Sequence, residues 1–292
     1  MIVLLFLLFD QFLIDPLRHL VEAEQALQRW QFALLILDVL IVTVIGYWLN
    51  DHYDRKVDAI NRPDRFLVRF RIAESQFYSW VFSLLAVGVI ITIYLAIEAD
   101  KLNWIWIYPL TITLLWRYAK NGKRWGIWGN ILVSLFIACI PLLFLLAEQS
   151  LITELRANHE DNYNRFILVL SLFTLLMFLL NLSREIVKDL QDMTGDAVAQ
   201  ATSIPLLVGI ARTKTIIVFV LALSASVQWS LFFVLNNSQI VCAYSVLVSI
   251  LLLITVVRLM KSDTSAGFGK GSLMLKILMI FGLFELIFIP IA

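Results

Sequence analysis

Cysteine and charge are scarce in this sequence, and each shortage excludes a class of protein. Only two of the 292 residues are cysteines, Cys139 and Cys242, and both fall inside apolar stretches. They provide neither a disulfide framework nor the CxxC spacing of a zinc site. Charged residues make up 15% of the chain, against about 25% in soluble domains. A soluble globular domain is therefore not expected anywhere in the chain.

The N-terminus lacks the features of a cleaved secretory signal. It has no basic stretch at its start, it carries Asp10 and Asp15, and no small-residue cleavage site follows. The net charge of +1 also lacks the strong basic excess typical of nucleic-acid binding. We expect no nucleic-acid partner, and no feature of the sequence indicates an obligate protein partner.

What the chain has in excess is long apolar blocks, because 61% of its residues are hydrophobic. A transmembrane helix needs roughly 20 mainly apolar residues to cross about 30 Å of hydrocarbon. Backbone polar groups must be satisfied inside the lipid, so such blocks form helices. The sequence therefore predicts an all-α polytopic membrane protein, a single domain over 1–292 with the lipid bilayer as its solvent. Nine segments are predicted to span: 1–17, 31–49, 77–97, 103–118, 126–147, 163–181, 214–235, 239–260 and 271–291.

The basic residues are distributed unevenly between the connecting segments. Those after the second, fourth, sixth and eighth spans, counted with Arg117, Lys214 and Arg258 at the adjoining span ends, contain 17 of the 23 lysines and arginines. Positive charge concentrates on the cytoplasmic side of membrane proteins. The distribution predicts a protein of the inner (cytoplasmic) membrane with its N-terminus inside and its C-terminus outside.

Two acidic clusters follow the second and sixth spans, with no glycine or proline between the span and its first acids. We therefore expect each helix to continue past the membrane surface, although Gly195 is a candidate end for the second helix. Four crossings separate the clusters, so both should lie on the same side. The first cluster places four oxygen-bearing side chains within an arc of roughly 100° on an ideal helix: Asn50, Asp51, Asp54 and Asp58. The second places its acids within roughly 60°: Glu185, Asp189, Asp192 and Asp196.

Carboxylates stacked on one helix face repel each other and destabilise an isolated helix. A hard divalent cation offsets this repulsion, and Mg²⁺ is typically held by one or two carboxylates together with substrate phosphates. Two such faces would hold a diphosphate through metal, with nearby basic side chains neutralising the remaining charge. The alternative is that each cluster is a solvated loop with local ion pairs. A basic segment after the fourth span is a further candidate phosphate contact: Tyr118, Lys120, Lys123 and Arg124, followed by Gly129 and Asn130.

These residues resemble the motifs of the UbiA superfamily of intramembrane prenyltransferases. That family has nine helices and two aspartate-rich motifs on cytosolic helix extensions. The first motif, NDxxDxxxD, is complete from Asn50 to Asp58 and continues as Asn61-Arg62-Pro63. The second contains Arg184-Glu185, Lys188-Asp189, Asp192 and Gly195-Asp196. The resemblance implies a bundle of the UbiA type with a cytosol-facing active-site cavity.

The resemblance also implies a reaction and its residues. A prenyl group passes from an isoprenoid diphosphate, geranylgeranyl diphosphate as first choice, to a lipophilic acceptor, with Mg²⁺ as cofactor. The implied metal ligands are Asn50, Asp51, Asp54, Asp58, Asp189, Asp192 and Asp196. The implied catalytic residues are Asp54, Asp58, Asp192 and Asp196. The implied diphosphate-binding residues are Asn50, Arg62, Lys123, Arg184 and Lys188.

Several functions remain open at this point. Within the family, the continuation at Asn61-Arg62-Pro63 and the form of the second motif look most like the geranylgeranylglycerol-phosphate geranylgeranyltransferase branch, which makes ether lipids. The nearer rival prenylates an aromatic quinone precursor. A divalent-cation transporter is disfavoured because transporters place ionisable residues near the bilayer midplane, whereas both clusters lie at span ends. A catalytically silent scaffold of the same fold is the last alternative.

Overall fold

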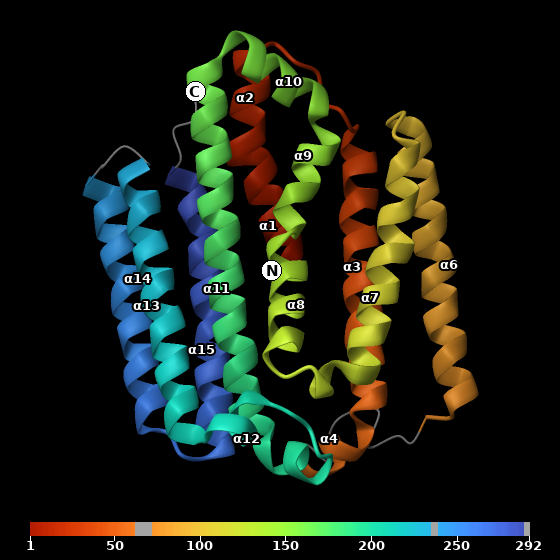
Figure 1. Cartoon of the computed structure of the whole chain (residues 1–292). Coiled ribbons are helices and arrows are strands. Elements are labelled where there is room, and N and C mark those ends of the chain that lie inside the picture. The colour runs from red at the N-terminus through yellow and green to blue at the C-terminus, as the bar shows by residue number, and fades with distance from the viewer. Residues whose placement is uncertain (62–71, 235–238, 289–292) are drawn as a thin grey trace. The chain divides into compact units, whose positions relative to one another are not determined.

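The computed structural model describes residues 1–61, 72–234 and 239–288, and these contain helices but no strand (Figure 1). The α-helices are α1 Ile2–Phe9, α2 Asp15–Leu20, α3 Arg29–Tyr53, α4 Arg55–Asn61, α6 Glu74–Glu98, α7 Ile107–Asn121, α8 Ile127–Ala138, α9 Leu143–Ala147, α10 Gln149–Asn158, α11 Glu160–Val198, α12 Ile204–Val208, α13 Ile210–Val234, α14 Gln239–Lys261 and α15 Ser265–Phe284. Single turns of other helix types are the π-helix η1 Asp10–Ile14 and the 3₁₀ helices η2 Leu102–Trp106, η3 Gly122–Arg124, η4 Ile140–Leu142 and η5 Glu285–Phe288. The all-helical prediction is confirmed.

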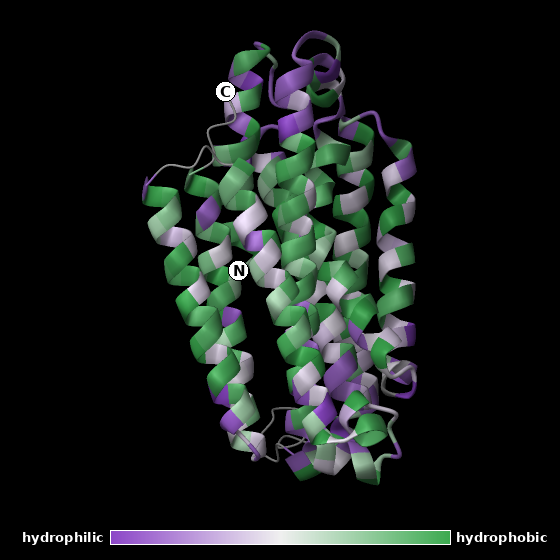
Figure 2. Ribbon diagram, turned by 60° about the vertical axis from the view of Figure 1, so that its left-hand side comes forward, coloured by the Kyte–Doolittle hydropathy of each residue, from purple (hydrophilic) through white to green (hydrophobic). Residues whose placement is uncertain are grey.

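Seven helical segments in this described part are long and apolar enough to cross a membrane: Arg29–Tyr53, Glu74–Glu98, Ile127–Ala147, Glu160–Val198, Ile210–Val234, Gln239–Lys261 and Ser265–Phe288. They match seven of the nine predicted spans, so the chain is a multi-span membrane protein. Figure 2 shows apolar residues along the middle of the long helices and hydrophilic ones near many of the helix ends. Such a distribution suits helices whose central part contacts hydrocarbon.

The other two predicted spans are helical but do not reach this standard, so the count of nine is not confirmed. Around 103–118 the regular helix α7 is only 15 residues long. Around 1–17 the helix changes type, because α1 passes into a π-helical turn before α2 begins. This widened turn ends at Ile14, two residues before Pro16, which has no N–H to donate to the preceding turn.

Two compact units account for the described residues. The first contains residues 1–25, 130–191 and 204–292, and the second contains 26–129 and 192–203. In the second unit α3 packs against both α6 and α7 (Figure 1). Gly88 allows α6 to contact α7 closely, since a Cβ there would lie 2.0 Å from the hydroxyl oxygen of Tyr108 on α7. In the first unit α14 packs against α13 and α15, and α15 also contacts α1.

An ion pair is buried in the first unit. Arg18 is 6% exposed and Glu148 is 3% exposed, and Arg18 Nη2 donates to Glu148 Oε1. The same nitrogen lies 2.9 Å from Asp10 Oδ1. This pair ties the N-terminal helices to the junction between α9 and α10, which is consistent with the contact of α10 with α2.

We expect Arg18→Met to lower the free energy of unfolding by about 3 kcal/mol, because it leaves the Glu148 carboxylate buried without its partner. His19→Gln is the matched control, since the side chain of His19 is 83% exposed and surface changes usually stay within about 0.5 kcal/mol. Unfolding of the purified protein in detergent would be followed by circular dichroism. Equal stabilities of the two variants would contradict a structural role for the pair.

Candidate functional site

The first acidic motif lies where α3 passes into α4. Asn50 and Asp51 belong to the last turn of α3, Asp54 caps it, and Asp58 lies in the first turn of α4. The expected continuous helix is therefore interrupted at Asp54. The helical spacing nevertheless persists, because the Asp54 N–H donates to the Asn50 carbonyl at 2.9 Å and the Asp58 N–H to the Asp54 carbonyl at 2.8 Å. The side chain of Asn50 also donates to Asp54 Oδ2 at 2.9 Å.

The second motif lies on α11, which continues to Val198. Gly195, a candidate end for this helix, does not end it. The Ala199 N–H still donates to the Gly195 carbonyl at 3.0 Å, and the chain turns only at Gln200, which has a positive φ of 53°. The Ala201 N–H then donates to the Asp196 carbonyl at 2.9 Å, a bond that satisfies a terminal carbonyl as in a Schellman motif. Asp192 and Asp196 therefore lie one turn apart on a regular helix.

Gly195 has a packing role instead. A Cβ at this position would lie 2.5 Å from Asn61 Nδ2 and 2.8 Å from Val57 Cγ1, both on α4. The side chain of Asn61 donates to the Asp192 carbonyl at 2.9 Å and accepts from the Gly195 N–H at 3.0 Å. The last turns of α4 and α11 are thus joined directly. This contact brings the first motif and the end of the second together within the second compact unit.

The carboxylates around this contact differ in exposure. Asp58 and Asp196 are buried at 4% and 2% exposed, whereas Asp51, Asp54 and Asp192 are partly exposed. All five make further polar interactions. Among the described residues, no three histidine, cysteine or acidic side chains are grouped closely enough to hold a metal ion by themselves. The donors are all oxygens, which suits Mg²⁺ held by one or two carboxylates plus phosphate oxygens.

Further back on α11, and in the first unit, Glu185 is the centre of a buried charge cluster. It is 5% exposed. Its Oε1 pairs with Arg184 Nη1 and its Oε2 with Lys188 Nζ, both at 2.8 Å. Asp189 accepts from Asn130 Nδ2 at 2.8 Å. Two of the four cations predicted to bind diphosphate are therefore oriented by Glu185, a role that its place in the acidic cluster did not indicate.

Two other predicted site residues cannot be placed in the same way. Arg62 lies outside the described residues. Lys123 belongs to the turn η3, but its side chain is not among those described.

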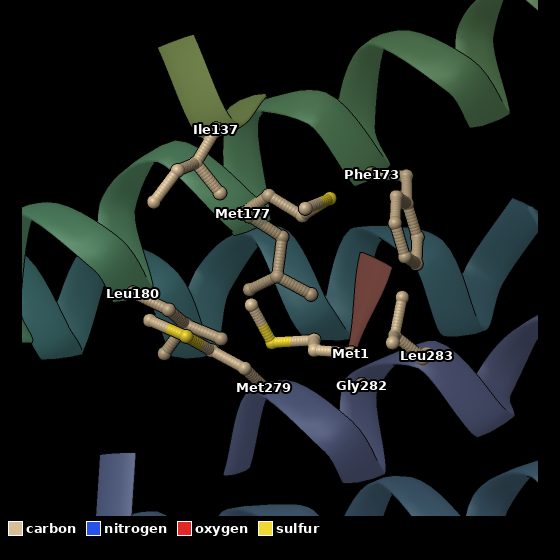
Figure 3. Close-up of a pocket in the computed structure, with 9 residues that line it drawn as sticks. Met1, Ile137, Phe173, Met177, Leu180, Met279, Gly282 and Leu283 are labelled. Atoms are coloured by element: carbon tan, nitrogen blue, oxygen red, sulfur yellow. The ribbon is translucent and has the colours of Figure 1, made fainter. Parts of the chain in front are cut away.

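An apolar pocket lies in the first unit, between α8, α11 and α15 (Figure 3). Its lining consists of Met1, Ile137, Phe173, Leu176, Met177, Leu180, Met279, Gly282 and Leu283. Figure 3 shows Met279 next to Leu180 at one end and Leu283 next to Phe173 at the other. Such a lining suits a hydrocarbon chain and offers no side-chain hydrogen bond to a polar ligand.

Comparison with known proteins shows which family the chain matches. The profile of the UbiA prenyltransferase family matches residues 19–270. Digeranylgeranylglyceryl phosphate synthase of Korarchaeum cryptofilum is 29% identical over 258 residues, which cover 86% of this chain and 82% of that protein. The enzyme of the same name from Sulfolobus acidocaldarius is 36% identical over 171 residues. That second match covers 57% of this chain and only 55% of the relative.

A solved structure shows the same fold. It is described as the apo structure of a UbiA homolog from Aeropyrum pernix K1, with a TM-score of 0.67 and 14% sequence identity. The match covers 95% of this chain and 96% of that one. At this identity the likeness concerns the fold alone.

We expect Asn61→Ala to loosen α4, because it removes both side-chain hydrogen bonds to α11 and leaves their partners unsatisfied. Each such bond contributes about 1 kcal/mol. Hydrogen–deuterium exchange of residues 55–61 should therefore accelerate in the variant. Lys56→Ala is the control on the same helix, since Lys56 is exposed. Identical exchange in the two variants would show that Asn61 does not hold α4 in place.

Proposed function

We propose that this chain, which belongs to the UbiA prenyltransferase family, transfers a geranylgeranyl group from geranylgeranyl diphosphate to geranylgeranylglyceryl phosphate. The proposal rests on the joining of α4 to α11 by Asn61 and Gly195, which connects the helices that carry the two acidic motifs. The name of the relatives supports the acceptor, because their product is a glyceryl phosphate that carries two geranylgeranyl groups. The reaction completes the hydrocarbon part of a membrane ether lipid.

The proposed chemistry breaks one C–O bond and forms another. The allylic C–O bond of the donor breaks, and its electron pair leaves with the diphosphate. The allylic carbon then bonds to the acceptor hydroxyl oxygen, which releases its proton. Bound Mg²⁺ would act as a Lewis acid that stabilises the charge on the departing diphosphate. The protein has to hold the diphosphate in place and keep water from the allylic carbon.

Each task is assigned here to residues that the sequence predicted. The metal-holding oxygens would come from Asn50, Asp51, Asp54, Asp58, Asp189, Asp192 and Asp196. Asp54, Asp58, Asp192 and Asp196 are the members closest to the chemistry in this proposal. The diphosphate would be bound by Asn50, Arg62, Lys123, Arg184 and Lys188. The apolar pocket of Figure 3 would hold part of a prenyl chain and exclude water from it.

The membrane arrangement proposed with this function follows the charge distribution. Nine crossings in one domain would place the N-terminus inside and the C-terminus outside, and the active-site cavity would face the cytoplasm. The seven clear spans support a multi-span protein. The two remaining crossings would be α1–α2 and the segment containing α7.

We expect Asp54→Asn and Asp192→Asn each to lower kcat by about 100-fold or more. Loss of one metal-holding carboxylate removes several kcal/mol of charge stabilisation, and each 1.36 kcal/mol is tenfold in rate. The control is Asp161→Asn, an exposed carboxylate in the first turn of the same helix α11, which should retain full turnover. Full activity in either site variant would refute the assignment of its aspartate.

We expect the purified protein in detergent to convert geranylgeranyl diphosphate and geranylgeranylglyceryl phosphate into the doubly prenylated ether when Mg²⁺ is present, and to make none with excess EDTA. Products would be identified by mass spectrometry. A parallel reaction would offer a hydroxybenzoate or a dihydroxynaphthoate instead. A prenylated aromatic product alone would overturn the proposed acceptor and support the quinone branch. No product from any acceptor would refute prenyl transfer as stated here.

A further inference from the structure

Lys276 is a cation in the interior of α15, a helix long and apolar enough to span the membrane. A charged side chain inside a span is costly, and such residues almost always face the bundle interior or a watery cavity. Lys276 is nevertheless exposed, and neither the acidic motifs nor the apolar pocket includes it. The position of Lys276 is therefore not explained by either of these two sites.

The helix face that carries Lys276 is the face turned toward α11. Residues 269, 272, 276, 279 and 283 follow the alternating spacing of three and four that lines one side of a helix. A Cβ on Gly269 would lie 3.1 Å from Gln191 Nε2 of α11. Met279 and Leu283 share the apolar pocket with residues of α11. Lys276 lies between these two contacts on the same face.

The level at which Lys276 meets α11 follows from the same contacts. The Ser265 hydroxyl donates to the Gln191 carbonyl at 2.8 Å, and Gly269 also lies against Gln191. Met279 lies next to Leu180 (Figure 3). The two helices are thus antiparallel, and ten residues along α15 from Gly269 correspond to about eleven back along α11. Lys276 follows Gly269 by seven residues along α15. At the same ratio, it lies level with Arg184 and Glu185 on α11.

Electrostatics agrees with this register, because the charge of Lys276 acts on the buried Glu185 carboxylate. Both oxygens of that carboxylate are already paired at 2.8 Å, one with Arg184 and one with Lys188. Lys276 is thus a third cation beside one buried carboxylate. Several cations at one level of a spanning segment favour binding of an anion.

We propose that Lys276 binds a phosphate oxygen of a substrate, and that Arg184, Lys188 and Lys276 form an oxyanion site organised by Glu185. The inference rests on the proposed prenyl transfer for the identity of the substrate, but the site itself does not depend on it. Two sources offer the same chemistry, the diphosphate of the donor and the phosphate monoester of the acceptor. Glu185 holds Arg184 and Lys188 in position, so Lys276 is the member whose removal leaves the carboxylate paired.

The test compares Lys276→Gln with Lys276→Arg and with Lys270→Gln. Lys270 is an exposed lysine of the same helix on a different face, so its loss removes the same charge without touching the site. KM would be measured for geranylgeranyl diphosphate and geranylgeranylglyceryl phosphate separately. Binding of inorganic pyrophosphate and of glycerol 1-phosphate, each with Mg²⁺, would be measured by calorimetry. Lys276→Met provides a second neutral variant, and size-exclusion profiles report folding.

We expect Lys276→Gln to raise the KM for one substrate about tenfold, the scale of a charged hydrogen bond. Binding of the corresponding probe, inorganic pyrophosphate or glycerol 1-phosphate, should weaken by the same factor. A higher KM for the donor with weaker pyrophosphate binding identifies the diphosphate as the ligand. A higher KM for the acceptor with weaker glycerol 1-phosphate binding identifies the monoester. Lys276→Arg should retain most of the affinity and Lys270→Gln all of it.

The inference is overturned when both neutral variants at 276 match Lys270→Gln in KM and in calorimetry. Failure of the proposed function has a different signature. Wild-type protein would then make no ether product, yet calorimetry would still decide whether Lys276 contributes to oxyanion binding. If the Lys276 variants lose pyrophosphate binding while the wild-type protein shows no turnover, the oxyanion site is supported and the proposed reaction is rejected.

Discussion

The contact between Asn61 and the backbone of α11 is the interaction on which the proposed site depends. The acidic motifs are far apart in the chain, and Asn61 bonds directly to backbone atoms of Asp192 and Gly195. Only a residue without a side chain leaves room for this approach, because a Cβ on Gly195 would overlap both Asn61 and Val57. The helices that carry the two motifs are thus held together by hydrogen bonds between the neutral Asn61 side chain and the backbone of α11.

Burial of charge is the second constraint, and the chain meets it by pairing. Glu185 and Glu148 are almost fully buried, and each accepts a hydrogen bond from a cation. The two clusters differ in their balance of positive and negative charge. Arg18 faces several carboxylates, which suits a structural tie between helices. Glu185 faces several cations, which suits a site that binds an anion.

The sequence predicted the helical class and seven spans correctly because both depend on local properties. Apolar runs of sufficient length must form helices in lipid, whatever their neighbours are. The first and fourth predicted segments are helical but are not among the seven clear spans. Residues near Pro16 change helix type, and α7 is short because its segment begins as a 3₁₀ turn. Hydropathy measures how apolar a segment is, but it does not register where the backbone departs from a regular helix.

For the candidate site too, some features follow from local sequence and others from tertiary packing. The sequence by itself determined that Asn50, Asp54 and Asp58 share a helix face, since they are spaced four residues apart. Only the tertiary structure decided that Gly195 is a packing position and not a helix end, that Asn61 joins the motifs, and that Glu185 orients Arg184 and Lys188. It also brought Lys276 to the level of that cluster. Helical periodicity is set by neighbouring residues, whereas the burial and direction of a side chain and the contacts between helices depend on how the helices pack.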